Sequence, residues 1–442
     1  MKGHAVLGMF LQLAVMVAAI ALGSRKGGVA MGLWGAVGVF VLATFFGVTP
    51  ADTSGIVDVM LIILAVIMAA AAMEAAGGID YLVGLAERAI RRKPSRVVYV
   101  APLVSWAFTL GAGTAHVFYP LLPVIHDVAR EGGVRPERPI AVASIAATFG
   151  ITASPVSAAM AAMIVMFDGD GWNLPRIMAV AVPSTLLGVL VAATVQSRIG
   201  KELGQDAEYL RRLAAGEIEA PAPAEAAPPL RPRARWSAYL FLGGTVAVVL
   251  SGLFPALRPE TAEGPLSMPA TIEILMMAVA ALILLLCKVD AKRIPGTDVA
   301  KSGLVAVIGV FGLSWLGLSF IGANETRITG ALGGVAQDHP WFFAIMLLLL
   351  SALLFSQATT TKALMPLGLA LGIPAPLLIA MWPAVNGYFL LPTYGTFIAA
   401  INFDRTGTTR VGRFVVNHSF MLPGLITTCV AVSTGFALVQ IV

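Results

Sequence analysis

Long apolar runs separated by short polar segments dominate the chain. In its first half, runs near residues 4–23, 28–48, 54–75 and 177–197 each have about the 20 residues that a helix needs to cross a bilayer. Residues 79–93 differ, because apolar and charged residues alternate there at helical spacing. That second pattern predicts an amphipathic helix lying on the membrane surface. The hydropathy pattern therefore predicts two kinds of helix, spanning and interfacial.

Two further apolar segments of the first half are interrupted by small and hydroxyl-bearing residues. Residues 95–130 carry Gly113 and Thr114 in the middle and basic residues at both ends. Since basic loops stay in the cytoplasm, a re-entrant hairpin is predicted here, with two complete spans as the alternative. Residues 139–167 are interrupted at Ser154 and the proline that follows it. A serine before a proline predicts an N-cap and the first residue of a second half-helix.

The second half repeats this order of segments. It comprises three predicted spans, a surface segment, a hairpin, a broken span and a final span, at 236–256, 268–288, 298–320, 324–339, 340–373, 376–402 and 414–440. Each half then crosses the membrane an odd number of times, five, which inverts the second half relative to the first. The predicted organisation is a first inverted repeat at 1–197, a cytoplasmic linker at 198–235 and a second inverted repeat at 236–442.

The interruptions of the two halves share one register. A shift of 246 positions carries Thr114 onto Thr360 and His116 onto Lys362. Matching interruptions in two halves are the best sequence sign of a transporter's binding site, which lies where the repeats meet near the bilayer midplane.

Composition supports a membrane protein. The 442 residues are 58% hydrophobic and 12% charged, with a mean hydropathy of +0.87, whereas soluble domains carry about 25% charged residues. Together with the spanning runs, this composition predicts an all-α polytopic membrane protein. The first run could also be a signal peptide, but Arg25 and Lys26 on its far side argue against that interpretation.

The net charge of +5 bears on orientation rather than on a nucleic-acid partner. Basic residues gather in short loops, which places the 198–235 segment inside and both termini in the periplasm. No basic helix face interleaved with aromatic residues predicts nucleic-acid binding. Cys287 and Cys429 lie far apart in apolar runs and suggest neither a disulfide framework nor a metal site. No nucleophile–base pair or phosphate-binding loop stands out, so transport without a cofactor is predicted rather than an enzyme.

The interruptions also carry the predicted substrate chemistry. Helix N-termini offer unpaired N–H groups and a partial positive charge, so half-helices that begin with hydroxyl-bearing residues suit an anion. The alternative is that these hydroxyls only join helices, as they commonly do in membranes. The predicted substrate-binding residues are Gly113, Thr114, His116, Thr152, Ser154, Ser157, Thr359, Thr360, Lys362, Asn386, Thr393, Tyr394 and Thr396.

Two basic residues among these narrow the choice of anion. His116 and Lys362 are each predicted in the first turn of a half-helix, where the helix dipole disfavours a cation. A small dicarboxylate would supply negative charge at both sites. Two alternatives stay open for Lys362, which could reach the membrane surface or pair with an acid such as Glu273. A neutral His116 could instead hydrogen-bond between helices.

Several long ungapped segments resemble a known family. They are AGGIDYLV at 76–83, ITASPVSAA at 151–159, PSTLLGVL at 183–190, KALMPL at 362–367 and INFDRTGTTR at 401–410. Through them the chain resembles the anaerobic C4-dicarboxylate transporter (Dcu) family along nearly its whole length. The segment at 401–410 is most similar to the fumarate–succinate exchanger branch. Ala115 with His116, and Ala147 with Thr148, are positions where other small or polar residues are expected in relatives.

The resemblance implies a carrier in the bacterial inner membrane that takes up fumarate, malate or aspartate and exports succinate during fumarate respiration. It also implies an elevator mechanism with paired re-entrant hairpins, a homodimer, and a sensor kinase as a possible partner. Two alternatives stay open at this point: a dicarboxylate channel, and an uptake symporter coupled to protons or sodium ions.

Overall fold

The structure, a computed structural model, describes residues 2–26, 28–167, 169, 171–216, 218, 231–262, 264–354, 356–391, 394–411 and 417–442. The chain begins with three long helices, α1 (Lys2–Lys26), α2 (Ala30–Phe46) and α3 (Ser54–Ala75). The amphipathic α4 (Gly78–Arg91) follows, and it buries its apolar face at helical spacing. Within the described residues, eight helices are long and apolar enough to cross a membrane.

A helical hairpin and a broken helix complete the first half. The hairpin consists of α5 (Val97–Ala112), a 3₁₀ turn (Ala115–Phe118) and α6 (Leu121–Glu131). The broken helix consists of α7 (Glu137–Ala153) and α8 (Ala158–Phe167), and α9 (Leu174–Gln196) follows it.

The break between α7 and α8 corrects one prediction. Ser154 does not cap the second half-helix: it ends α7 with an extended backbone, and its Oγ accepts a hydrogen bond from the Val156 N–H at 3.3 Å. The cap of α8 is Ser157, whose Oγ accepts from the Met160 N–H at 3.1 Å. Since a capping oxygen must reach an N–H two or three residues on, the helix begins after Ser157.

The second half has a comparable order of elements. Its helices are α11 (Ala234–Leu253), α12 (Met268–Cys287), α13 (Asp298–Asp338), α14 (Trp341–Leu354), α15 (Gln357–Ala370), α16 (Ala375–Met381), a 3₁₀ helix (Trp382–Phe389), α17 (Gly395–Phe403) and α18 (Met421–Leu438). A small antiparallel pair, β1 (Glu260–Thr261) with β2 (Gly264–Pro265), lies between α11 and α12 and is an addition to the all-α prediction.

Two boundaries in this half differ from those predicted. The predicted surface segment 324–339 is continuous with the preceding span in the single helix α13. Asn324 does not break the helix, because its Nδ2 donates to the Phe320 carbonyl within α13 and to Gln12 Oε1 of α1. The final helix begins at Met421 rather than near 414, since a hydrogen-bonded loop around Asp404 comes first.

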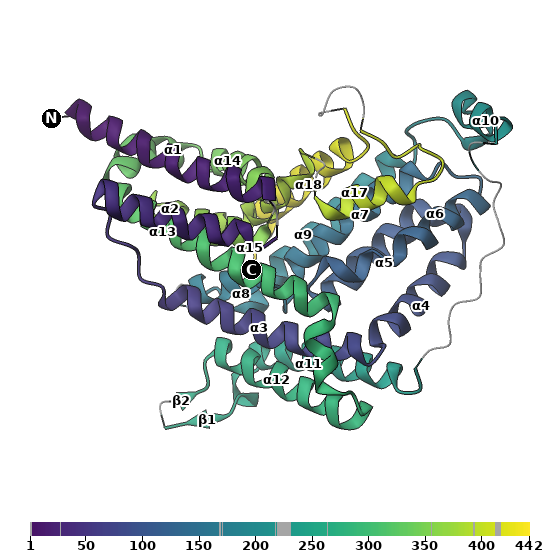
Figure 1. Ribbon diagram of the computed structural model, residues 1–442, viewed down its shortest axis with the longest axis horizontal. Coiled ribbons are helices and arrows are strands. Elements are labelled where there is room, and N and C mark those ends of the chain that lie inside the picture. Colours follow the sequence, from purple (N-terminus) through teal and green to yellow (C-terminus); the bar gives the residue numbers. More distant parts are fainter. Residues whose placement is uncertain are drawn as a thin grey trace.

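The helices pack in two groups. In one group α2 lies against α13, α3 lies against α12 and α13, and α11 lies against α12. In the other, α5 lies against α7, α9 against α18, and α14 against the 3₁₀ helix Trp382–Phe389. Figure 1 shows α1, α2 and α13 side by side at one end of the long axis, and α10 (Ala207–Ala214) at the opposite end.

In both halves, a glycine lets the first arm of the hairpin touch the broken helix. A Cβ on Gly150 of α7 would overlap the Trp106 carbonyl and Thr109 Oγ1 of α5. A Cβ on Gly387 would overlap the Leu348 carbonyl of α14 and would crowd the Ser351 hydroxyl there. Each hairpin is thereby packed directly against the broken helix of its own half.

The segment after α9 docks onto neighbouring loops. Arg135 in the α6–α7 loop pairs with Asp206, and Arg138 Nη1 lies 2.6 Å from Glu202 Oε1. Arg212 of α10 donates to the Thr406 carbonyl at 3.2 Å. This part of the predicted linker is therefore ordered against the body, whereas its Pro/Ala-rich stretch at 220–229 lies outside the described residues.

Candidate functional site

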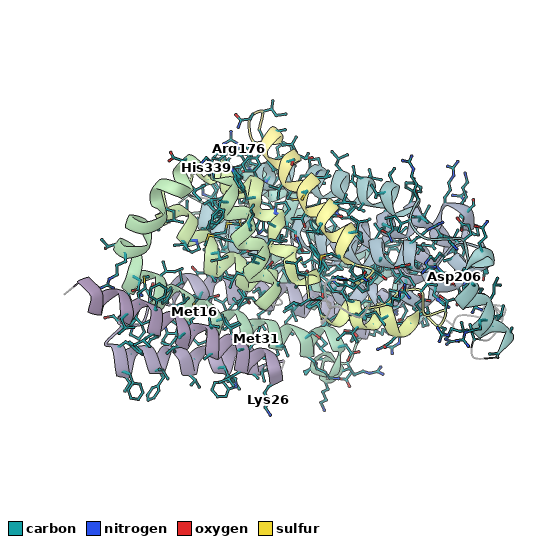
Figure 2. The ribbon with its side chains drawn as sticks, turned by 90° about the horizontal axis from the view of Figure 1, so that it is seen from above. Met16, Lys26, Met31, Arg176, Asp206 and His339 are labelled. Atoms are coloured by element: carbon teal, nitrogen blue, oxygen red, sulfur yellow. The ribbon has the colours of Figure 1, made fainter. Side chains whose placement is uncertain are left out.

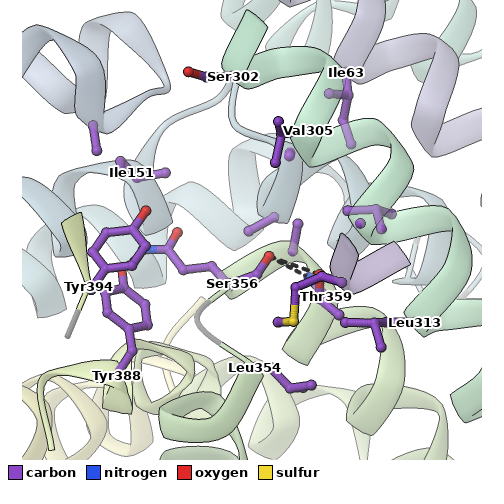
Figure 3. Close-up of a pocket in the computed structure, with 18 of the residues that line it drawn as sticks. Ile63, Ile151, Ser302, Val305, Leu313, Leu354, Ser356, Thr359, Tyr388 and Tyr394 are labelled. Atoms are coloured by element: carbon purple, nitrogen blue, oxygen red, sulfur yellow. Dashed lines mark hydrogen bonds between the residues drawn. The ribbon is translucent and has the colours of Figure 1, made fainter. Parts of the chain in front are cut away.

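A cavity of about 1130 Å³ lies where the tips of both hairpins meet the breaks of both broken helices. Most of its wall is apolar, and α1, α2, α3 and α13 together form one side of it. Met16 and Met31 belong to this wall, on the first two helices (Figure 2). The polar part of the wall is formed by Thr114, Tyr119, Ser302, Ser356, Gln357, Thr359, Tyr388 and Tyr394. Figure 3 shows the two tyrosines beside one another, with Ser356 and Thr359 further along the same wall.

The tip of the first hairpin is held close to the break of the first broken helix. Gly113 ends α5 with a φ of +68°, in the left-handed region that favours glycine. A Cβ at this position would lie 2.8 Å from the Val156 carbonyl oxygen. Thr114 and Tyr119 follow this turn and face the cavity, and the Tyr119 hydroxyl lies beside Gly395 at the start of α17.

The tip of the second hairpin presents the start of a helix. Ser356 is the N-cap of α15, and its Oγ accepts from the Thr359 N–H at 3.2 Å and from Thr359 Oγ1 at 2.9 Å. The next N–H, of Thr360, bonds the Ser356 carbonyl at 3.0 Å. The N–H groups of Gln357 and Ala358 come first in the helix and have no carbonyl within it to bond. Both residues line the cavity, so this helix start suits a carboxylate.

A buried polar network joins the two halves behind the cavity wall. Gln357 Nε2 lies 2.7 Å from the Thr148 carbonyl and 2.6 Å from Asn386 Oδ1. Asn386 Nδ2 in turn donates to Thr152 Oγ1 at 2.8 Å. Thr148 and Thr152 belong to α7 of the first half, whereas Gln357 and Asn386 belong to the second half. The bond between Asn386 and Thr152 therefore joins the two broken helices directly.

Lys362 lies deeper in α15 than predicted. The helix starts at Gln357, so Lys362 is in its second turn, 6% exposed, and not among the described residues that line the cavity. The carboxylate of Asp58 on α3 acts on it electrostatically, and Asp58 acts on Glu273 as well. Asp58 is thus an acid within electrostatic range of Lys362 that was not considered from the sequence.

The structure divides the predicted site residues into three sets. Four line the cavity: Gly113, Thr114, Thr359 and Tyr394. Seven are buried outside its described lining: Thr152, Ser154, Ser157, Thr360, Lys362, Asn386 and Thr396. The side chain of His116 and the whole of Thr393 lie outside the described residues.

The two hairpin tips are not equivalent in conformation, although the register of 246 pairs them. Thr114 lies in the turn after α5, whereas Thr360 lies in the first turn of α15. His116 lies in the 3₁₀ turn before α6 rather than in the first turn of a half-helix. In the first tip α5 ends at the left-handed Gly113, whereas in the second Ser356 caps the start of α15.

Five polar lining residues are additional to the predicted set: Tyr119, Ser302, Ser356, Gln357 and Tyr388. A signal for Ser356 was present in the sequence, since a serine three residues before a threonine-rich helical turn is a usual N-cap. No local pattern marked Tyr119 or Tyr388, because only the packing of the halves brings them to one wall.

Of the described residues that line the cavity, none carries a charge. An anion there would be held by N–H groups at a helix start, hydroxyls and phenols. These groups are hydrogen-bond donors and acceptors, so the described lining suits the binding of an anion.

Comparisons with known proteins agree on one family. The family model described as anaerobic C4-dicarboxylate membrane transporter matches residues 8–442. The chain is 40% identical to the anaerobic C4-dicarboxylate transporter DcuB of Escherichia coli, over 96% of this chain and 97% of that one. It is 41% identical to the C4-dicarboxylate transporter DcuA of Escherichia coli, over 97% and 98%. It is 38% identical to DcuA of Wolinella succinogenes, over 97% and 99%.

Two solved structures share the fold. The YdaH transporter of Alcanivorax borkumensis matches with a TM-score of 0.53 and 16% identity, over 99% of this chain and 97% of that chain. MtrF of Neisseria gonorrhoeae matches with a TM-score of 0.53 and 12% identity, over 98% and 94%. At these identities the likeness concerns the arrangement of helices alone.

Proposed function

Because this chain belongs to the DcuA/DcuB family of anaerobic C4-dicarboxylate membrane transporters, we propose that it exchanges C4-dicarboxylates across the bacterial inner membrane. It takes up fumarate, malate or aspartate and releases succinate. The observation that carries this proposal is the cavity between the hairpin tips, whose polar wall combines the start of α15 with hydroxyl and phenol groups. As a member of a transporter family, the protein is not an enzyme.

One carboxylate is assigned to each half of the molecule. The first is received at Thr114 and Tyr119, and the second at the start of α15, by the N–H groups of Gln357 and Ala358. Each carboxylate leaves water at a cost of several kcal/mol, so each needs donors of its own. Lys362 contributes positive charge from behind the second site. Thr152, Asn386 and the other buried site residues hold the wall in place.

Exchange is favoured over coupled uptake by charge balance. When fumarate or malate is exchanged for succinate, one dianion moves inward and another outward, so the loaded carrier has the same charge in both directions and needs no coupling ion. We propose an elevator movement of the hairpins, broken helices, α9 and α18 against a scaffold of α1–α3 and α11–α13. The short second arms, α6 and α15, support re-entrant hairpins, because neither has the roughly 20 residues of a span.

Two inverted repeats account for the way the helices pair. In such repeats α2 corresponds to α12 and α3 corresponds to α13. The contact of α2 with α13 therefore becomes the contact of α12 with α3, and both are present. The contacts at Gly150 and Gly387 also correspond. The β1–β2 pair and the start of α1 lie toward one end of the long axis, α10 lies toward the other, and the C-terminus lies near the middle of the view (Figure 1). Periplasmic termini and a cytoplasmic linker are proposed from the distribution of basic residues. A homodimer formed through the scaffold, and a sensor kinase as a partner, are proposed from the family resemblance.

Counterflow in liposomes tests this function. Purified protein is reconstituted, the vesicles are loaded with succinate, and entry of labelled fumarate is followed. Internal succinate should accelerate fumarate entry several-fold relative to empty vesicles. A fumarate current without such acceleration would identify a channel, and stimulation by a proton or sodium gradient alone would identify a symporter.

A further inference from the structure

Gln357 occupies a special position at the start of α15. It is 6% exposed, it lines the cavity, and its amide nitrogen is the centre of the network between the halves. Nε2 lies 2.7 Å from the Thr148 carbonyl, 2.6 Å from Asn386 Oδ1 and 2.9 Å from the Tyr388 hydroxyl.

These neighbours determine which way the amide points. The Thr148 carbonyl can only accept a hydrogen bond. The Asn386 atom facing Gln357 is also an acceptor, because the Asn386 nitrogen already donates to Thr152 Oγ1 at 2.8 Å and to the Pro383 carbonyl at 2.9 Å. A rotated Gln357 amide would therefore place oxygen against two acceptors. The Gln357 nitrogen Nε2 must therefore face the network. The amide oxygen Oε1 points away from these acceptors.

Gln357 Oε1 is a buried acceptor with no hydrogen-bond partner among the described residues. Such a group is satisfied only by a donor. The N–H groups of Gln357 and Ala358, which suit a carboxylate, belong to the same helix start. Gln357 thus combines a helix-start N–H that suits a carboxylate with a buried acceptor that has no donor among the described residues.

This pairing fits one subclass of C4-dicarboxylate. In aspartate and malate, the carbon next to one carboxylate carries an ammonium or hydroxyl group, which is a hydrogen-bond donor. Fumarate and succinate have no donor at that carbon. We propose that Gln357 selects 2-amino- and 2-hydroxy-dicarboxylates over unsubstituted ones, with Oε1 accepting a hydrogen bond from the 2-substituent. This inference rests on the proposed function, because it assumes that C4-dicarboxylates enter this cavity.

A series of ligands tests the proposal on the unaltered protein. Calorimetry in detergent is used to compare L-aspartate, L-malate, succinate and 2-methylsuccinate, in which a methyl group replaces the donor at similar size. We expect aspartate and malate to bind about tenfold or more tightly than 2-methylsuccinate, the ratio that one satisfied buried hydrogen bond supports. Equal affinities for aspartate, malate and 2-methylsuccinate would overturn the proposal.

Two variants separate selection from a purely structural role of Gln357. Gln357→Leu removes Oε1, and the affinity ratio of aspartate to succinate should fall about tenfold. Thr152→Val removes a neighbouring bond of the same network but keeps Oε1, so it should weaken both ligands alike and leave the ratio unchanged. If Gln357→Leu weakens both ligands by the same factor, Gln357 only joins the halves and the proposal is wrong.

Failure of this inference can be told from failure of the proposed function. If succinate binds and exchanges but the 2-substituent has no effect, only the role of Gln357 is overturned. If none of the four ligands binds, the dicarboxylate function is overturned, and the role of Gln357 with it.

Discussion

Single residues show how the protein holds charge away from water. Asp404, 4% exposed, follows α17, and its carboxylate accepts from the Thr409 N–H at 2.6 Å and from Thr408 Oγ1 at 2.8 Å. His126 Nδ1 lies 3.5 Å from Asp404 Oδ1. Burial by itself raises the pKa of Asp404, but His126 and the hydrogen bonds from Thr406 and Thr409 outweigh burial and lower this pKa to about 2.

The lowered pKa of Asp404 makes stability depend on acidity. Because the folded pKa lies below the unfolded value of about 3.9, the ionised carboxylate stabilises the fold above roughly pH 4. That stabilisation is lost as the pH falls toward 2. We expect Asp404→Asn to lower the free energy of unfolding near pH 6, and the gap to wild type to narrow by about 2 kcal/mol between pH 5 and pH 2.

Thermal unfolding in detergent across this pH range measures the effect of Asp404→Asn. Asp298→Asn is the matched control, because the side chain of Asp298 is 81% exposed. A gap between Asp404→Asn and wild type that stays constant from pH 5 to pH 2 would contradict the proposed charge on Asp404.

Lys362 provides a second prediction at this scale. A dianion in a cavity whose described lining carries no charge needs a positive charge nearby, so Lys362→Met should lower fumarate affinity at least about tenfold. The double variant with Asp58→Asn should stay weak, because removing the acid does not restore a cation. Calorimetry with a check of the melting temperature measures both. Recovery of affinity in the double variant would show that Lys362 serves Asp58 and not the substrate.

At the scale of elements, each hairpin depends on backbone contact with its broken helix. Ser351 strengthens that contact in the second half, because its hydroxyl accepts from the Gly387 N–H at 2.8 Å. In the first half, the Thr109 hydroxyl of α5 donates to carbonyls of its own helix and packs against Gly150. We therefore expect the hairpins to move with the broken helices rather than as separate lids.

A larger side chain at either glycine should destabilise the protein and weaken fumarate binding in the cavity. Gly150→Val and Gly387→Val insert methyl groups where a carbonyl already lies, and such overpacking usually costs about 1–3 kcal/mol. We expect a melting temperature lower by several degrees and weaker fumarate binding. Gly243→Val in α11 is the control, since nothing lies within 4 Å of a Cβ built there. Unchanged fumarate binding in both Gly150→Val and Gly387→Val would mean that the hairpins move independently of the broken helices.

At the scale of the whole molecule, the two packing groups meet between α13 and α15. A Cβ on Gly317 of α13 would lie 3.5 Å from the Ala363 Cβ of α15, a separation typical of a disulfide. In a background with Cys287 and Cys429 replaced by serine, Gly317→Cys with Ala363→Cys should form a disulfide that stops counterflow until it is reduced. The reason is that the bond ties the proposed moving body to the scaffold.

The control for this crosslink is Gly244→Cys with Val279→Cys, which joins α11 to α12 inside the scaffold at the same 3.5 Å separation. It should leave counterflow intact under oxidising conditions. Full transport with the α13–α15 disulfide formed would exclude an elevator movement between these two bodies.

Much of the secondary structure was present in the sequence. Hydropathy located the long helices, and the small and hydroxyl-bearing interruptions near Thr114, Ser154 and Gln357 located the breaks. These features are local, because an apolar run of spanning length must be helical in a bilayer and a break must be solvated by something polar. The family followed from long matching segments, and the match over residues 8–442 confirms it.

What only the tertiary structure decided is which of these groups share one wall. Tyr119 and Tyr388 line the cavity, Thr152 and Asn386 belong to the network behind it, and Lys362 lies within electrostatic range of Asp58. Sequence spacing gives the face of a helix but not the rotation of one helix against another, which depends on close contacts such as those at Gly150 and Gly387. The same limit hid Gln357, whose significance lies in neighbours 209 and 29 residues away along the chain.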